Sequence, residues 1–186
     1  MIVERATVDD ACDVAAIQVE AWRTAYAGII SSAYLSRMST ERLAAHWRRM
    51  IAAGNPMVLV ARDDAPTMLG WLALGTCRDP DAPPSQAEIW AINVAPSAWL
   101  GGVGRALWQR ARQTLREAAF TSCSLRVLEQ NSQAIRFYRA LGFTPDAAPP
   151  LGFVLDGQTL RTVRFHHALY AERPGPRSST RSISRG

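Results

Sequence analysis

Residues 89–107 constrain the fold and the kind of binding site of this chain more than any other segment. They read as a strand that runs into a glycine-rich turn and then into a helix. Its sequence is IWAINVAPSAWLGGVGRAL. Glycines let a backbone approach a bound group without a Cβ in the way, and a helix N-terminus presents unpaired N–H groups with about half a positive charge. The segment therefore predicts a phosphate-binding turn. A dinucleotide-binding turn would need G-x-G-x-x-G, whereas Gly102-x-Gly104 is followed here by Leu107, which disfavours that class.

The hydrophobic pattern changes its period along the chain and predicts a mixed α/β fold. Apolar residues recur at helical spacing between about residues 7 and 53, and they form short β-like runs between residues 57 and 94. Thr7 and Asp10 have the spacing of a capping box, and Asp156-Gly157 has the composition of a hairpin turn. One sheet with helices on both faces is the natural solution for this order. The expected strands are 2–6, 57–62, 67–76, 87–94, 124–128, 153–155 and 160–169, and the expected helices are 7–25, a short segment from 31, 40–53, one opening at 101–104, and 131–141.

The 186 residues suffice for one domain, which we place at residues 1–172, followed by an Arg/Ser/Pro-rich C-terminal tail at 173–186. The tail carries four arginines and no acid, and the remaining residues hold 17 arginines against 16 acids. A body this close to neutral lacks the broad basic face that nucleic-acid binding uses. No apolar run approaches the roughly 18 residues of a membrane helix, and the N-terminus does not resemble a signal peptide. We therefore expect a cytoplasmic protein with no membrane partner, and the charge distribution disfavours a nucleic-acid partner.

Residues that are missing from the sequence exclude several chemistries. All 21 basic residues are arginines, which excludes a P-loop lysine and Schiff-base chemistry. Cys12, Cys77 and Cys123 show no C-x-x-C spacing, which disfavours a zinc site. His166 and His167 are adjacent on an expected strand, so their side chains point to opposite faces. We expect no metal.

A second segment at residues 125–143, LRVLEQNSQAIRFYRALGF, completes a pattern with the first. Together the two closely resemble the GNAT N-acetyltransferase superfamily over roughly residues 2–170, and AWRTAYAGI at 21–29 is similar to a common bacterial subgroup of it. In that family a V-x-P-x-x-[QR]-x-x-G-x-[GA] loop holds the pyrophosphate of acetyl-CoA. A later V-x-x-x-N-x-x-A-x-x-x-Y-x-x-x-G-F segment supplies an Asn near the pantetheine arm and a Tyr near the sulfur. The matching residues are Val94, Pro96, Gly102, Gly104, Val127, Asn131, Ala134, Tyr138, Gly142 and Phe143.

The resemblance implies both a fold and a reaction. The implied fold is α/β (α+β), with a mixed, mostly antiparallel central sheet, a splayed strand pair and helices on both faces. The implied reaction moves an acetyl group from acetyl-CoA to a primary amine, on a small molecule or a peptide, by direct attack in a ternary complex. A homodimer is also compatible with the family. Two alternatives stay open: a catalytically weak acyl-CoA-binding regulatory module on the same fold, and a nucleic-acid adaptor that uses the arginine tail.

Binding of acetyl-CoA falls, by this resemblance, to the glycine-rich turn, to the strand before it and to one asparagine. Trp99 and Leu100 stand where the family often has Gln/Arg and Gly. The backbone donors do not depend on side chains, and Arg105 is available to supply charge instead. The implied acetyl-CoA-binding residues are Ile92, Asn93, Val94, Leu100, Gly101, Gly102, Val103, Gly104, Arg105 and Asn131.

The resemblance also implies catalytic roles, each beside a simpler interpretation. Tyr138 is the candidate acid for the leaving thiolate, and its alternative is a buried tyrosine on an amphipathic helix. Glu88, fourteen residues before Gly102, is the candidate base, and its alternatives are an exposed glutamate or a base that acts through water. Arg126 stands where other members carry an acid, which disfavours that second version. The candidate acceptor wall is Trp22, Tyr26 and Tyr34, for which ordinary core packing is the alternative.

Overall fold

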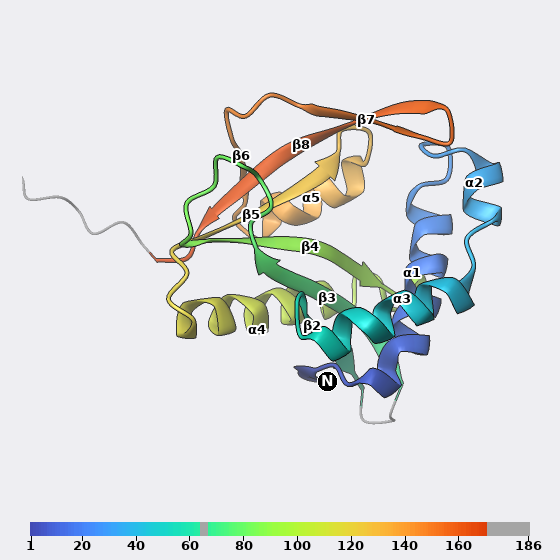
Figure 1. Ribbon diagram of the computed structural model, residues 1–186, viewed down its shortest axis with the longest axis horizontal. Coiled ribbons are helices and arrows are strands. Elements are labelled where there is room, and N and C mark those ends of the chain that lie inside the picture. Colours follow the sequence, from blue (N-terminus) through green and yellow to red (C-terminus); the bar gives the residue numbers. More distant parts are fainter. Residues whose placement is uncertain (64–66, 171–186) are drawn as a thin grey trace, which may run out of the picture.

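The computed structural model describes residues 1–63 and 67–170 (Figure 1). The predicted tail at 173–186, and the predicted domain boundary at 172, lie outside the described residues. Two short 3₁₀ turns, Val8–Asp10 and Pro96–Ala98, precede α1 and follow β4. The helices are α1 (Ala11–Ala25), α2 (Ser32–Ser36), α3 (Thr40–Ala53), α4 (Val103–Glu117) and α5 (Ser132–Ala140). The strands are β1 (Ile2–Arg5), β2 (Met57–Arg62), β3 (Met68–Thr76), β4 (Gln86–Val94), β5 (Ser122–Leu128), β6 (Thr144–Pro145), β7 (Leu151–Leu155) and β8 (Gln158–Ala168).

The strands form one mixed sheet in the order β1-β2-β3-β4-β5-β8-β6, with β7 paired to β8. Within the described residues the β4–β5 pairing is parallel, and every other strand pairing is antiparallel. A parallel pair needs a crossover connection, and α4 provides it between β4 and β5. The predicted fold, a mostly antiparallel sheet with helices on both of its faces, is confirmed.

Alternation along the central strands gives the sheet two hydrophobic faces, and each is covered by helices. Leu59 and Ala61 of β2 pack in the core that contains the apolar residues of α4. Their neighbours Val58 and Val60 pack in the second core, with α1 and α3. Because side chains alternate across a strand, a strand buried on both faces reads as a nearly continuous apolar run, such as the VLVA of β2. Figure 1 shows α4 and α3 on different sides of the sheet.

The parallel pair β4–β5 is joined over only part of its length. The paired residues run from Gln86 to Ile89 in β4 and from Ser122 to Leu125 in β5. Beyond them β4 continues to Val94 beside β3, while β5 continues to Leu128 beside β8. The two strands therefore separate towards their C-terminal ends, which confirms the predicted splayed pair.

Local boundaries differ from the expected ones where a turn, and not hydrophobicity, sets them. The helix expected to open at 101–104 begins at Val103, because Gly102 lies in the left-handed region with φ 81°. Asp156 and Gly157 have φ 51° and 76°, the positive values that a two-residue hairpin turn requires. The two-residue strand β6 has no hydrophobic signal of its own and exists through its pairing with β8.

Candidate active site

A cavity of about 820 Å³ opens where β4 and β5 separate. Its walls come from α1, β4, the start of α4, the end of β5, α5 and the β7–β8 hairpin. Most of the predicted site residues line it, but Glu88, Gly101 and Tyr34 do not. The predicted residues in its lining are Trp22, Tyr26, Ile92, Asn93, Val94, Leu100, Gly102, Val103, Gly104, Arg105, Asn131 and Tyr138.

The glycine-rich turn presents the N-terminus of α4 to this cavity. The first N–H groups of a helix have no partner within the helix, and Gly102 has no side chain that could cap them. The Gly101 N–H, in contrast, donates to the carbonyl of Ala98 at 3.3 Å, so it is not a free donor. Leu100 adopts φ 64° and is fully exposed. A non-glycine residue there carries backbone strain, so the turn keeps its shape despite a side chain that does not favour it.

Gly104 allows α4 to approach α5 closely at the edge of the cavity. A Cβ at this position would lie 2.7 Å from the Cζ atom of Phe137 and 2.9 Å from its Cε2 atom. Only a glycine leaves room for that ring. Gly104 therefore allows Phe137 to take its place in the wall of the cavity.

The outer edge of β4 offers backbone groups to the cavity. The Ala95 N–H donates to the Leu69 carbonyl of β3 at 2.9 Å. Alternate residues of an antiparallel strand direct their N–H and C=O groups the same way, so Ile92 and Val94 direct theirs away from β3, into the gap. The Trp99 indole donates to the Val94 carbonyl at 2.8 Å. Trp99, which stands at the family's Gln/Arg position, therefore occupies one backbone acceptor of this edge. The N–H and C=O groups of Ile92 remain available to a ligand.

Asn131, Tyr26 and Tyr138 meet at the bottom of the gap. The Asn131 side chain caps α5 by accepting from the Ala134 N–H at 3.0 Å, and it is buried. Burial raises the pKa of Tyr26, and a hydrogen bond with the Asn131 side chain opposes this shift. Burial also raises the pKa of Tyr138 well above 10, and the nearby Tyr26 adds to the shift. Both phenols are therefore protonated at neutral pH, and Tyr138 can donate a proton or a hydrogen bond.

Glu88 lies on β4 but outside the cavity, and its carboxylate is already engaged. Its Oε1 accepts from the Arg78 Nη2 at 2.6 Å, and its Oε2 accepts from the Arg78 Nε at 3.0 Å and from the Arg78 backbone N–H at 2.9 Å. Arg78 also stacks over the ring of Trp90 at 4.4 Å. This arrangement does not support the base role that the resemblance implies for Glu88. It supports a positioning role, because Glu88 fixes Arg78 and Arg78 covers Trp90.

The acceptor wall is built by two of the three predicted aromatic residues. Trp22 and Tyr26 line the cavity in edge-to-face contact, with ring centroids 5.1 Å apart. All three aromatic residues pack against the small core around Leu35 and Leu128, but Tyr34 does not line the cavity. That is the simpler interpretation of Tyr34, and the sequence alone could not separate the two.

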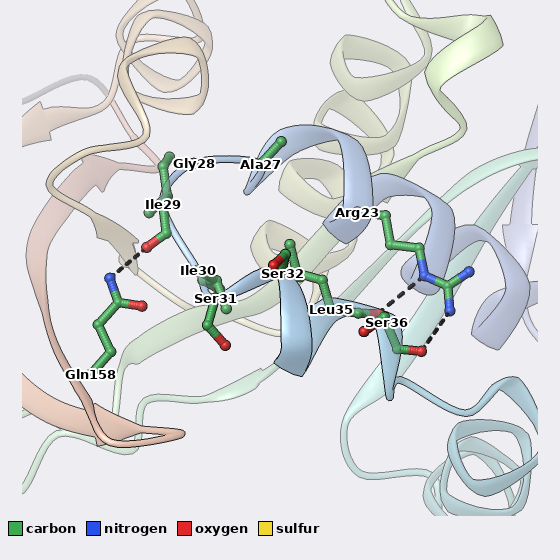
Figure 2. A pocket seen from close by; sticks show the side chains of 10 residues that line it. All are labelled: Arg23, Ala27, Gly28, Ile29, Ile30, Ser31, Ser32, Leu35, Ser36 and Gln158. Carbon is green, nitrogen blue, oxygen red and sulfur yellow. Dashed lines mark hydrogen bonds between the residues drawn. The ribbon is translucent and has the colours of Figure 1, made fainter.

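The segment between α1 and α2 is tied to the β7–β8 turn, which holds the wall in place. Gln158 donates to the Ile29 carbonyl at 2.8 Å (Figure 2), and Ser31 donates to Asp156 at 2.8 Å. A second hollow of about 750 Å³ lies over this segment. Arg23, the charged residue among its described lining residues, is occupied by the carbonyls of α2 and its neighbours (Figure 2). The hollow lies apart from the glycine-rich turn, so the cavity at the splay is the candidate site.

Among the cavity-lining residues that the structure describes, three are arginines and none is acidic. Arg105 was predicted, whereas Arg126 and Arg136 were not assigned a binding role. The lining residues that the sequence did not single out also include Trp90, Gln133, Phe137, Phe153, Leu155 and Thr162. The hairpin residues Phe153, Leu155 and Thr162 lie outside both motifs, so neither motif could have identified them.

The match to known families decides what kind of protein this is. The sequence model described as the acetyltransferase (GNAT) family matches residues 18–143. The chain belongs to this family. The resemblance seen in the two motifs is thereby confirmed, and the GNAT match contains both of them.

Individual GNAT relatives extend the similarity over most of the chain. An uncharacterized N-acetyltransferase of Bacillus subtilis, YuaI, is 29% identical over 161 residues, which cover 87% of this chain and 89% of the relative. A spermidine N(1)-acetyltransferase of Thermoplasma acidophilum is 23% identical and covers 83% of this chain and 94% of the relative. The solved structure of YncA, a putative acetyltransferase from Salmonella typhimurium with its cofactor acetyl-CoA, superposes with a TM-score of 0.70 at 22% identity. The superposed region covers 93% of this chain and 96% of the YncA chain, which establishes the shared GNAT fold.

Two further findings concern metals and membranes. In the described ranges, no group of three or more His, Cys, Asp or Glu side chains could hold a metal ion. None of the helices in the part of the chain that the structure describes has the length and apolar character needed to cross a bilayer.

Proposed function

We propose that this protein is an acetyl-CoA-dependent N-acetyltransferase that transfers the acetyl group directly to a primary amine in a ternary complex. The observation that carries the proposal is the convergence of the α4 N-terminus, the free edge of β4 and Tyr138 on one cavity. The solved relative with bound acetyl-CoA is consistent with this reading.

The residues present suit acetyl-CoA at both of its polar parts. The N–H groups at the start of α4, with Arg105 beside them, would hold the diphosphate. The backbone of Ile92 would pair with the pantetheine arm, because its groups point into the gap between the strands. The 820 Å³ cavity has the size of a small-molecule site. Acetyl-CoA would supply the acetyl thioester on which the amine acts.

The chain's own residues then move the protons. The acceptor loses its ammonium proton to water, because the one candidate carboxylate, Glu88, lies outside the cavity. The neutral amine attacks the carbonyl, a C–N bond forms and the C–S bond breaks. The nitrogen, which is positively charged after the attack, releases its second proton to water. Tyr138 donates its proton to the departing thiolate and regains one from water, since its raised pKa keeps it protonated until that moment.

A binding experiment and a rate experiment test this proposal together. Isothermal titration with CoA is expected to show binding, and acetyl-CoA with a panel of primary amines is expected to release free thiol in step with acetylated product. The absence of heat with CoA would remove the proposal altogether.

The engaged carboxylate of Glu88 favours a second candidate, a catalytically weak acyl-CoA-binding regulatory module. This candidate predicts CoA binding without amine-dependent thiol release. Release that saturates with amine concentration would reject it, and binding without release for every amine would favour it.

A further inference from the structure

One end of the cavity lies on the side of the sheet away from α4, and we call it the acceptor end. Arg126 belongs to it, because Arg126 alternates on β5 with Leu125 and Val127, which pack in the core beneath α4 and α5. Its boundaries therefore come from α1, β4, β5 and the β7–β8 hairpin. The side chains that define it are Trp22, Trp90, Arg126, Phe153, Leu155 and Thr162.

The charged side chain at the acceptor end is an arginine. Among the described residues that line this end, Arg126 is the charged one and none is Asp or Glu; Asp79, which is outside the lining, pairs with Arg126. The other two lining arginines lie on helices, Arg105 in the first turn of α4 and Arg136 on α5. A cationic polyamine chain needs carboxylates along its path, so this cavity does not suit one. A neutral amine that carries a negative group elsewhere does suit it.

The guanidinium of Arg126 is held firmly and still has a donor to offer. Its Nε and Nη2 donate to the Asp79 Oδ1 at 3.1 and 2.8 Å. Its Nη1 is buried and has no hydrogen-bond partner among the described residues. Buried donors are nearly always satisfied, and an arginine fork is suited to a carboxylate.

Asp79 keeps this guanidinium in place and is itself fixed. Its second oxygen accepts from the Arg164 Nη1 at 2.9 Å, and the Arg164 Nε donates to Asp146 at 2.6 Å. The side chain of Arg126 is 22% exposed and lines the cavity, while Nη1 itself is covered, so a ligand group would have to displace part of the wall to reach Nη1. Asp79 therefore orients the guanidinium and leaves one donor for a ligand.

We propose that the acceptor is a primary amine that also carries a carboxylate and an apolar body, and that Arg126 binds the carboxylate through Nη1. The apolar body lies against Trp22, Trp90 and Phe153. This inference rests on the proposed acetyl transfer and narrows its acceptor to amino-acid-like molecules.

Matched acceptor pairs test the inference. Phenylalanine with phenethylamine, and tryptophan with tryptamine, differ by the carboxylate alone, and spermidine represents the polyamines. With the full chain and saturating acetyl-CoA, kcat/KM is expected to be roughly 10- to 100-fold higher for the acid of each pair, the effect of one charge-assisted hydrogen bond. An equal or higher value for the decarboxylated amines or for spermidine would overturn the inference.

Variants of Arg126 locate the effect. In Arg126→Gln, the KM for phenylalanine is expected to rise roughly 10-fold or more, and the value for phenethylamine to change far less. Arg126→Lys keeps a cation beside Asp79 without the guanidinium fork. Its KM for phenylalanine is expected to lie between the values of the wild type and of Arg126→Gln. Arg161→Gln is the matched control, because Arg161 is exposed on β8, pairs with Glu129 and does not line the cavity. CoA affinity, measured for each variant, shows that the variants are folded. Equal losses for the acid and for its amine would contradict the assignment.

The failure of this inference is distinguishable from the failure of the proposed function. Transfer to phenethylamine or spermidine without any preference for the acid overturns only the acceptor class. If no amine in the panel reacts although CoA binds, the melting temperature of the CoA complex is measured with each acceptor. A shift with phenylalanine that Arg126→Gln abolishes supports the inference, and equal or absent shifts overturn it.

Discussion

Tyr138 combines burial with a position on the cavity wall, and this pairing determines how the proposed reaction depends on pH. The pKa of its phenol is raised by burial and by Tyr26, so Tyr138 stays protonated up to at least pH 10. We expect Tyr138→Phe to lower kcat by roughly 100-fold or more, the usual contribution of a general acid, with CoA affinity within about twofold. In the wild type, kcat should rise with pH as the amine deprotonates, with no falling limb below pH 10. A falling limb near neutral pH that Tyr138→Phe removes would contradict this assignment.

For Glu88 we expect the opposite result, a small effect of substitution on kcat. Both of its oxygens accept from Arg78 and Glu88 does not line the cavity, so Glu88→Gln should change kcat by no more than about threefold, far less than the loss of a proton-transfer group. A base that took the amine proton would cost roughly 100-fold or more. Steady-state kinetics decide between these outcomes, with Glu129→Gln as the matched control because Glu129 lies outside the cavity. A large fall in kcat that only Glu88→Gln shows would restore the base role.

The sequence was sufficient to predict individual site residues where they belong to a short motif. Gly102 was predicted from the glycine-rich turn, and Asn131 and Tyr138 from the family resemblance, because each stands in a short motif. Glu88 could not be judged, because Arg78 reaches it only when β3 and β4 pair. Arg126 was noticed for the acid that it replaces, and its contact with Asp79 depends on a loop forty-seven positions earlier in the chain.

The meeting of two helices, α4 and α5, depends on the absence of one side chain. Gly104→Ala would place a Cβ 2.7 Å from Phe137, so we expect it to destabilise the protein by about 1–3 kcal/mol, as overpacking does, and to weaken CoA binding. Shortening the ring in Gly104→Ala/Phe137→Leu should recover part of the loss. Urea unfolding measures both variants, and the same loss in the single and double variants would refute the steric explanation.

Gly102→Ala is the matched control for that prediction. No atom lies within 4 Å of its added Cβ, but φ is 81°, so it should cost about 1 kcal/mol through backbone strain alone. Phe137→Leu should give it no recovery. The sequence indicated that both glycines matter, and only the packing shows that they matter for different reasons.

The loop between β3 and β4 is anchored to the sheet by Asp79, and its anchor depends on pH. Burial alone would raise the pKa of Asp79, but hydrogen bonds from Arg164 and Arg126 outweigh it and hold the pKa below 3.8. A carboxyl whose folded-state pKa is lowered contributes stability above its unfolded pKa, and this is lost as the pH falls through the folded value. We expect Asp79→Asn to cost about 3 kcal/mol at pH 7. The difference from the wild type should shrink below about pH 4, and urea unfolding at several pH values measures it. A difference that is the same at pH 3 and pH 7 would contradict the ionic anchor.

The element order was largely predictable, because hydrophobic period and turn chemistry are properties of short segments. The strand β6 and the 3₁₀ turn at Pro96–Ala98 were not, since each depends on contacts with distant strands or on the exact course of a turn. The splay between β4 and β5 was predicted from the family resemblance. The hydrophobic periodicity could not predict it, because the pattern is the same for a paired and an unpaired length of β4.

At the scale of the whole molecule, the splay leaves the two halves of the sheet joined by four residue pairs between β4 and β5. A ligand that pairs with β4 and contacts α5 bridges these halves, so its binding energy should appear as global stability. Acetyl-CoA at about 100 times its Kd is expected to add about 2.7 kcal/mol to the free energy of unfolding and to raise Tm by roughly 5–10 °C. Hydrogen exchange should slow at the N–H groups of Ile92 and of the first turn of α4, which the ligand would cover. ADP, which offers the diphosphate without the pantetheine arm, should protect the α4 turn and leave Ile92 unchanged. Stabilisation by acetyl-CoA that leaves exchange at both places unaltered would mean that the ligand binds elsewhere on the protein.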